Sequence, residues 1–143
     1  MPTAALLTFG GARLIPLKNA EDARMENIQL KASTTYAKGT LVGEITASPG
    51  TYGPYASGNS DGTQLPTHIL EYACKTDASK NITLGDGTAG NEWGLTVKAA
   101  PAFRCGYFAC EDLVGLDANA VTALKARLTA GDTTTGRIMI PGA

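Results

Sequence analysis

The sequence predicts a mainly β domain with one short helix, preceded by an extended N-terminal arm. Seventeen glycines in 143 residues indicate many turns, as in β-rich folds. Residues 27–31 alternate apolar and polar residues, which is the pattern of a half-buried strand. One stretch near the C-terminus has the spacing of an amphipathic helix. The length is that of a single domain with its own core.

Residues 1–27 are assigned to the arm and a linker, and residues 28–143 to the β-rich domain. Gly10-Gly11 and Pro16 interrupt the arm, whose apolar side chains follow no helical or strand period. These side chains are Leu6, Leu7, Phe9, Leu14, Ile15 and Leu17. The arm either finds a partner outside the domain or folds back on its own core. Residues 18–27 (KNAEDARMEN) predict a short helix or a solvated linker.

Strands are expected where short apolar-polar runs lie between turn residues. They are residues 27–31, 40–46, 51–52, 68–74, 81–84, 95–98, 101–110 and 137–140. The aromatic residues of 101–110 suit a pleated, partly buried surface. Residues 53–67 form a wide turn between two strands, and the polar stretch 76–94 forms a long connection.

The helix is predicted at residues 117–128 (DANAVTALKARL). Asp117 is a suitable N-cap. Val121, Leu124 and Leu128 share one helical face. Gly131 is a plausible stop.

Composition excludes several classes of function. The net charge is −1 and charged residues make up 17% of the chain, so no basic surface for nucleic acid is expected. No basic segment precedes the apolar part of the N-terminus, and no apolar run approaches the ~20 residues of a spanning helix. We therefore expect a soluble protein without membrane contact, made in the cytoplasm. Cys74, Cys105 and Cys110 predict free thiols rather than disulfides or a zinc site.

No catalytic residue, metal ligand or cofactor is predicted. His68 is the sole histidine, and a catalytic histidine needs a nucleophile or carboxylate within hydrogen-bonding reach. Asp61 and Glu71 are the candidate carboxylates, but the spacing requires neither, so we expect a structural or surface histidine. The GDGTAG segment at 85–90 lacks the Gly-Lys-Ser/Thr ending of a phosphate loop. The NSDG segment at 59–62 has too few carboxylates for calcium, and both segments predict turns.

Four short segments follow one another in a distinctive order. KGTLVGEIT at 38–46 is followed by YGPY at 52–55, with SDGTQ at 60–64 and the Ile-Leu pair at 69–70. VKAAPAF at 97–103 is third, and LDA at 116–118 opens the helix. In this order and spacing, over residues 28–128, they resemble tailed-phage head decoration proteins of the lambda type. The chain departs from that pattern at His68 and Pro101, where the family commonly has glycine.

The resemblance implies a small β-tulip or β-barrel-like domain that is not an enzyme. It implies a homotrimer on the outer surface of the phage head, at three-fold and quasi-three-fold sites, bound to the major capsid protein after expansion. The arm of such proteins lies along the capsid, so its six apolar residues are the expected capsid-binding residues. Tyr52, Pro54, Tyr55 and Asp61 form an expected contact loop toward a neighbouring subunit or the capsid.

A second hypothesis is a β-barrel module that binds a ligand or catalyses a reaction at His68, with Tyr55 and Asp61. The sequence indicates no substrate for it. An apolar arm that adds a strand to a partner suits the first hypothesis, because main-chain hydrogen bonds then supply affinity. Three arms on one trimer act at high effective concentration, which offsets the entropy lost when each arm becomes ordered.

Overall fold

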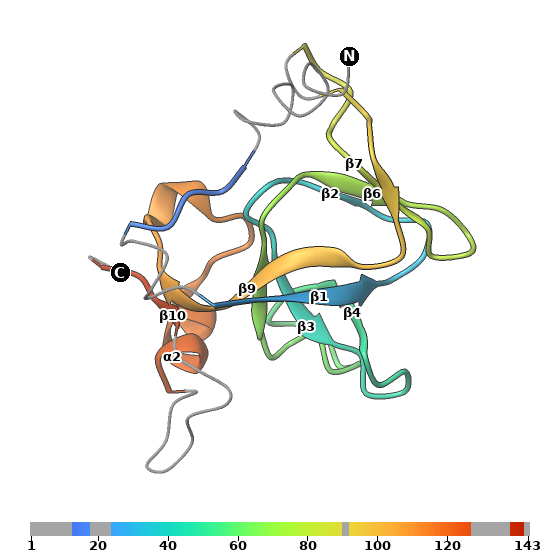
Figure 1. The fold of residues 1–143 in the computed structure, drawn as a ribbon. Coiled ribbons are helices and arrows are strands. Elements are labelled where there is room, and N and C mark those ends of the chain that lie inside the picture. Colours follow the sequence, from blue (N-terminus) through green and yellow to red (C-terminus); the bar gives the residue numbers. More distant parts are fainter. Residues whose placement is uncertain (1–12, 18–23, 90–91, 127–137, 142–143) are drawn as a thin grey trace.

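The computed structural model describes residues 13–17, 24–89, 92–126 and 138–141. They form the predicted mainly β domain (Figure 1). The strands are β1 (Arg24–Leu30), β2 (Thr35–Tyr36), β3 (Leu41–Glu44), β4 (Thr51–Pro54), β5 (His68–Leu70), β6 (Cys74–Thr76), β7 (Ile82–Leu84), β8 (Thr96–Val97), β9 (Ala100–Tyr107) and β10 (Ile138–Met139). A short 3-10 helix covers Cys110–Asp112 and helix α2 covers Ala118–Ala126.

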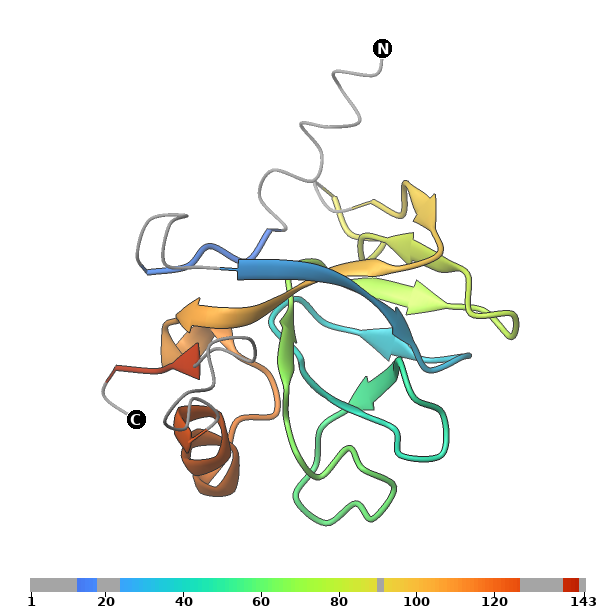
Figure 2. The same cartoon turned by 60° about the horizontal axis from the view of Figure 1, so that its bottom comes forward.

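Five strands close into a barrel in the order β1-β4-β3-β5-β9, and β9 returns to pair with β1. Every pairing in the barrel is antiparallel except β1–β4. Strand β10 extends the sheet by pairing with β9 in parallel. Strands β2-β6-β7-β8 form a separate antiparallel sheet. Figure 2 shows β1 and β9 running side by side as the longest strands of the fold.

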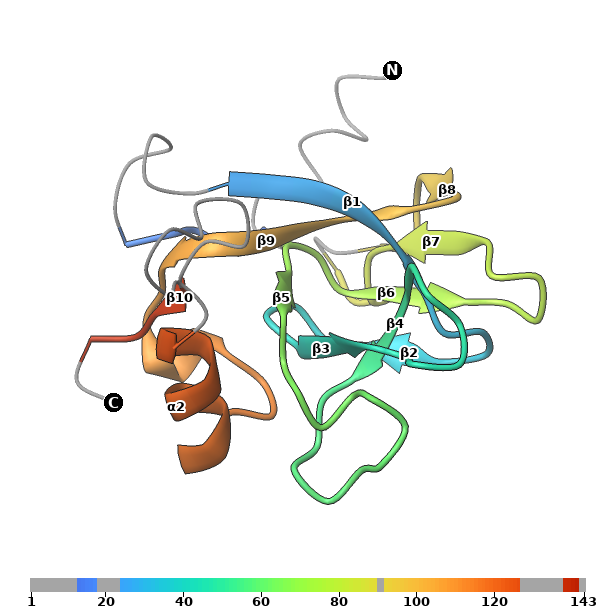
Figure 3. The same ribbon diagram turned by 90° about the horizontal axis from the view of Figure 1, so that it is seen from below.

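The barrel wall separates two apolar cores because successive side chains of a strand point to opposite faces. The inner core joins the barrel interior to the small sheet. It contains Ile28, Leu30, Tyr36, Val42, Leu70, Cys74, Ile82, Leu84, Ala100 and Ala102. Figure 3 shows the small sheet on one side of the barrel and α2 with β10 on the other.

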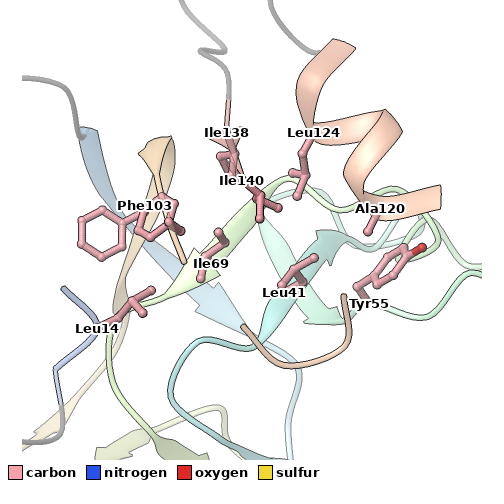
Figure 4. Close-up of a cluster of buried hydrophobic side chains, with 10 residues drawn as sticks. Leu14, Leu41, Tyr55, Ile69, Phe103, Ala120, Leu124, Ile138 and Ile140 are labelled. Atoms are coloured by element: carbon pink, nitrogen blue, oxygen red, sulfur yellow. The ribbon is translucent and has the colours of Figure 1, made fainter. Parts of the chain in front are cut away.

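The outer core lies between the barrel wall and the α2–β10 side. It contains Leu14, Leu41, Tyr55, Ile69, Phe103, Phe108, Ala120, Leu124, Ile138 and Ile140. Figure 4 shows how Leu41 and Ile69 of the wall face Ala120 and Leu124 of the helix. Neighbouring residues of one strand thus serve different cores, as Leu41 and Val42 do on β3.

The cap predicted for the helix is confirmed. The Ala120 N–H donates to Asp117 Oδ1 at 2.8 Å, which satisfies one of the free donors of the first turn. The Tyr55 hydroxyl donates to the same oxygen at 2.7 Å. Leu124 is fully buried and Val121 packs against the outer core. Leu128 and Gly131 lie outside the described residues.

Three expectations about the strands need correction. Arg24–Asn27 is neither helix nor linker, because β1 begins at Arg24 and pairs there with β9, so the predicted boundary at residue 27 falls inside β1. The strand expected at 68–74 is split, since β5 ends at Leu70 and β6 of the other sheet begins at Cys74. Cys110 belongs to the 3-10 helix and not to β9.

Candidate interaction surface

The described part of the arm, Arg13–Leu17, packs against the domain itself. Leu14 is 1% exposed and belongs to the outer core. Its N–H donates to the Glu71 carbonyl oxygen at 2.8 Å. The Glu71 N–H donates to the Pro101 carbonyl oxygen at 3.2 Å, but Pro101 has no N–H to return the bond. The Leu14 N–H therefore donates to the Glu71 carbonyl oxygen in place of the N–H that Pro101 lacks.

The side chains of this segment strengthen the attachment. Arg13 Nε donates to Glu71 Oε2 at 2.6 Å, and the Glu71 side chain is 8% exposed. Burial raises the pKa of Glu71, and the nearby Arg13 guanidinium opposes that rise. Further along, the Leu17 N–H donates to the Tyr107 carbonyl oxygen at 2.8 Å. Residues 13–17 are thus held at both ends.

This packing corrects the role predicted for Leu14, whose side chain faces its own core and not a partner. Of the two alternatives for the arm, residues 13–17 follow the one in which it folds back. Ile15 and Leu17 nevertheless point outward, at 58% and 55% exposure. Leu6, Leu7 and Phe9 lie outside the described residues.

Replacing Arg13 by alanine should destabilise the protein more at neutral pH than in acid. Without the guanidinium, the pKa of Glu71 rises further above its unfolded value. A carboxyl with a raised folded pKa contributes stability below its unfolded pKa and loses it as pH rises through the folded pKa. We expect a loss of about 1 kcal/mol at neutral pH, because Arg13 is half exposed and the pair is screened, and a smaller loss near pH 4.

Urea unfolding of wild type and Arg13→Ala at both pH values measures this difference. Ile15→Ala, two residues away on the same segment, is the control. An Arg13→Ala cost that grows as pH falls would contradict the assignment of Glu71 as its partner.

The loop between β4 and β5 lies across the β3–β4 hairpin and is held there by several hydrogen bonds. The Thr46 N–H donates to the Asp61 carbonyl oxygen at 2.8 Å. Asp61 Oδ1 accepts from the N–H and the hydroxyl of Thr63, at 3.0 and 2.5 Å. These bonds, with the hydroxyl as the main cause, lower the pKa of Asp61. The turn predicted at SDG is therefore an Asx turn.

Close backbone approach explains two glycines of this region. A Cβ on Gly43 would collide with the Leu65 carbonyl oxygen, and one on Gly62 with the Glu44 carbonyl oxygen. The loop can therefore lie against β3 only if both residues lack a side chain. Strand β3 and the turn at residues 60–64 can therefore pack closely because glycine stands at both contact points.

The four residues of the predicted contact loop occupy different environments. Tyr52 and Pro54 are half-buried. Tyr55 is 6% exposed in the outer core, and burial, aided by its bond to Asp117, raises its pKa to about 12. Little of the Tyr55 side chain is left for a partner. Asp61 is exposed, and with Leu65, which is 61% exposed, it marks the accessible part of the loop.

His68 is buried, with a side chain that is 6% exposed. Its Nε2 lies 2.5 Å from Glu26 Oε1, and its Nδ1 lies 2.8 Å from Thr67 Oγ1. The carboxylate that the described bonds give His68 is thus Glu26 of β1. Tyr55 and Asp61 make their hydrogen bonds to Asp117 and Thr63, so none of the bonds described joins the three residues of the second hypothesis.

Glu26 and Arg13, the hydrogen-bond partners of His68 and Glu71, were not among the residues predicted from the sequence. A usable signal for Glu26 was present, because Glu26, Ile28 and Leu30 alternate along one strand and so share one face. No comparable pattern marks Arg13, whose partner Glu71 is set by the fold.

No group of three or more His, Cys, Asp or Glu side chains in the described ranges is arranged to hold a metal ion. Within the same ranges no helix has the length and apolar character needed to cross a membrane. Comparisons of the chain with protein-family models, curated proteins and solved structures give no match.

Proposed function

We propose that this protein decorates a phage head. It binds the outer surface of the expanded capsid as a homotrimer, at three-fold and quasi-three-fold sites, and stabilises the shell against internal DNA pressure. The observation that carries the proposal is the order of the four segments that resemble lambda-type decoration proteins. A non-enzymatic role accords with the tyrosine, aspartate and histidine of the second hypothesis being engaged in separate bonds.

The glycines of the resembling segments support this proposal. Gly39 and Gly43 belong to KGTLVGEIT, and Gly62 to SDGTQ. Each occupies a position where a Cβ would collide with a backbone oxygen. These motifs therefore encode a specific packing of the loop and the 3-10 helix against β3.

The attachment of residues 13–17 also suits a capsid-bound arm. Because Arg13 and Leu14 are fixed on the body, an arm that begins before them starts from a defined point. Pre-positioning of this kind reduces the entropy lost on binding. Ile15 and Leu17 offer exposed apolar side chains beside that point, and apolar side chains of this kind suit docking against a protein surface.

A truncation that spares Leu14 tests the proposal. Deleting residues 1–12 should remove most of the affinity for expanded heads and leave the domain folded, since it spares Leu14, the first residue of the described cores. The measurement is co-sedimentation of purified protein with expanded heads prepared without it. The heads are those of the phage from which the chain derives. Longer deletions would also remove the core residue Leu14, so that a loss of binding could not be distinguished from a loss of folding.

The controls separate the parts of the proposal. Ile15→Ser with Leu17→Ser in the full chain tests the exposed apolar side chains alone, and far-ultraviolet circular dichroism verifies folding. If the truncated chain binds as tightly as the full chain, the arm is not the binding segment. If the full chain does not sediment with expanded heads at all, the decoration function itself is wrong.

A further inference from the structure

The tripeptide Asp-Gly-Thr occurs twice in the chain, beginning at Asp61 and at Asp86. Both copies form the same Asx turn. Thr63 donates its N–H and its hydroxyl to Asp61 Oδ1, at 3.0 and 2.5 Å. Thr88 donates the same two groups to Asp86 Oδ1, at 3.0 and 2.6 Å. The two turns therefore have the same local chemistry, and their surroundings distinguish them.

The Asp-Gly peptide unit can rearrange without an enzyme, because glycine places no side chain beside its own amide nitrogen. That nitrogen attacks Cγ of the preceding aspartic acid and an N–Cγ bond forms, while the carboxyl hydroxyl leaves as water together with the amide proton. Water then opens the resulting succinimide ring at either carbonyl carbon. Opening at Cγ restores aspartate, and opening at the backbone carbonyl leaves isoaspartate, whose main chain runs through Cβ. No other reactant is required.

The surroundings of the first turn hold its glycine amide away from this reaction. The Gly62 N–H donates to Gln64 Oε1 at 2.8 Å. The Thr46 N–H donates to the Asp61 carbonyl oxygen at 2.8 Å, and a Cβ on Gly62 would collide with the Glu44 carbonyl oxygen. An attack on Cγ would therefore have to break the Gly62 bond and turn the peptide unit against the backbone of β3.

In the described structure the second turn has neither restraint. Residues 86–89 are exposed. Among the hydrogen bonds of the described residues, none uses the Gly87 N–H. The atoms nearest to a Cβ on Gly87 belong to the Trp93 indole, which is a side chain and not a strand backbone. The Gly87 nitrogen is thus available, and the two Thr88 donors on Asp86 Oδ1 polarise the carboxyl group that it attacks.

We propose that Asp86 is a site of spontaneous isoaspartate formation in the folded protein, and that the hydrogen bond of the Gly62 amide protects Asp61 from the same reaction. Isoaspartate lengthens the main chain by one carbon and leaves the carboxylate on Cα. The side-chain oxygen that accepts from Thr88 then belongs to the backbone, so the turn beside Trp93 must rearrange. The inference concerns the chain itself and does not rest on the proposed function.

Ageing the purified protein in warm neutral buffer, followed by peptide mapping, tests the proposal. Trypsin places the two aspartates on different peptides, because Lys75 and Lys80 lie between them. Isoaspartate peptides separate from their aspartate forms by chromatography and have the same mass. We expect isoaspartate at Asp86 to accumulate about tenfold faster than at Asp61, since an ordinary hydrogen bond that must break slows a reaction by about this factor.

Two controls assign the difference to the fold. In urea the two sites should react at equal rates, because the tripeptides are identical. Gln64→Ala frees the Gly62 amide, so it should raise the rate at Asp61 and leave the rate at Asp86 unchanged, with folding verified by circular dichroism.

Equal rates at the two sites of the folded chain, or no isoaspartate at Asp86, would overturn the proposal. A difference that persists in urea would place its cause in the local sequence, and would overturn it as well. A folded Gln64→Ala chain in which Asp61 reacts as slowly as in the wild type would contradict the protective role of the Gly62 bond.

Discussion

Replacing Leu14 by alanine is expected to lower the free energy of unfolding by about 2–5 kcal/mol, which is the usual range for a fully buried leucine. Leu14 is 1% exposed and packs in the outer core with Ile69 and Phe103. The loss has two parts, the transfer of apolar atoms and the cavity that remains. Urea unfolding followed by circular dichroism measures it directly.

The matched control is Ile15→Ala, the next residue of the same segment. Its side chain is 58% exposed, and surface substitutions usually change stability by no more than about 0.5 kcal/mol. Equal effects of the two substitutions would mean that residues 13–17 do not pack as described. The large difference we expect would establish that the domain extends upstream of the predicted boundary.

The second large effect is expected for Gly39→Ala, at about 2–5 kcal/mol. Gly39 has φ +79°, a conformation that costs a residue with a side chain roughly 1–2 kcal/mol. A Cβ there would also collide with the Asp112 carbonyl oxygen, and overpacking of this kind adds roughly 1–3 kcal/mol. The substitution presses the 3-10 helix away from the start of β3.

Gly50→Ala separates these two contributions. Gly50 has φ +86°, and no atom lies within 4 Å of the position of its Cβ. The Gly50→Ala substitution therefore measures the cost of a positive φ alone, without a steric clash of the added Cβ. The unfolding free energy of Gly39→Ala should lie clearly below that of Gly50→Ala, and matching values would show that the 3-10 helix does not press on Gly39.

Local patterns predicted the elements of the fold well. Alternation located the strand near Ile28, apolar runs between turn residues located those near Val42 and Ile69, and the Asp117 cap with the Leu124 face located the helix. These patterns involve residues close together in the sequence, so they can be recognised without knowledge of the fold. The two-residue strand β2 was missed, because two residues carry no detectable period.

The pairing of the strands was beyond sequence reasoning. Closure of the barrel rests on Arg24–Ile28 meeting β9, a contact between segments far apart in the chain. Leu14 shows the same limit, since its N–H bonds to the Glu71 carbonyl oxygen and its side chain packs in the outer core, both far from it in the sequence. Nothing in the local sequence of residues 13–17 indicates these partners.

The residues predicted to contact a partner differ in their exposure. Ile15, Leu17 and Asp61 are exposed as a contact surface requires, whereas Leu14 and Tyr55 belong to the core. A run of apolar letters does not distinguish outward from inward side chains when it follows no period. His68 was expected to have a structural or surface role, and its partner Glu26 lies on the part of β1 that the sequence assigns to the linker.

The most direct measurement is electron microscopy of expanded heads mixed with the purified protein. The proposed function predicts added density on the outer surface at three-fold and quasi-three-fold positions, with three copies of the barrel in each. Density that is absent from saturated heads, or that lies at other positions of the shell, would contradict the central proposal of a trimeric decoration protein.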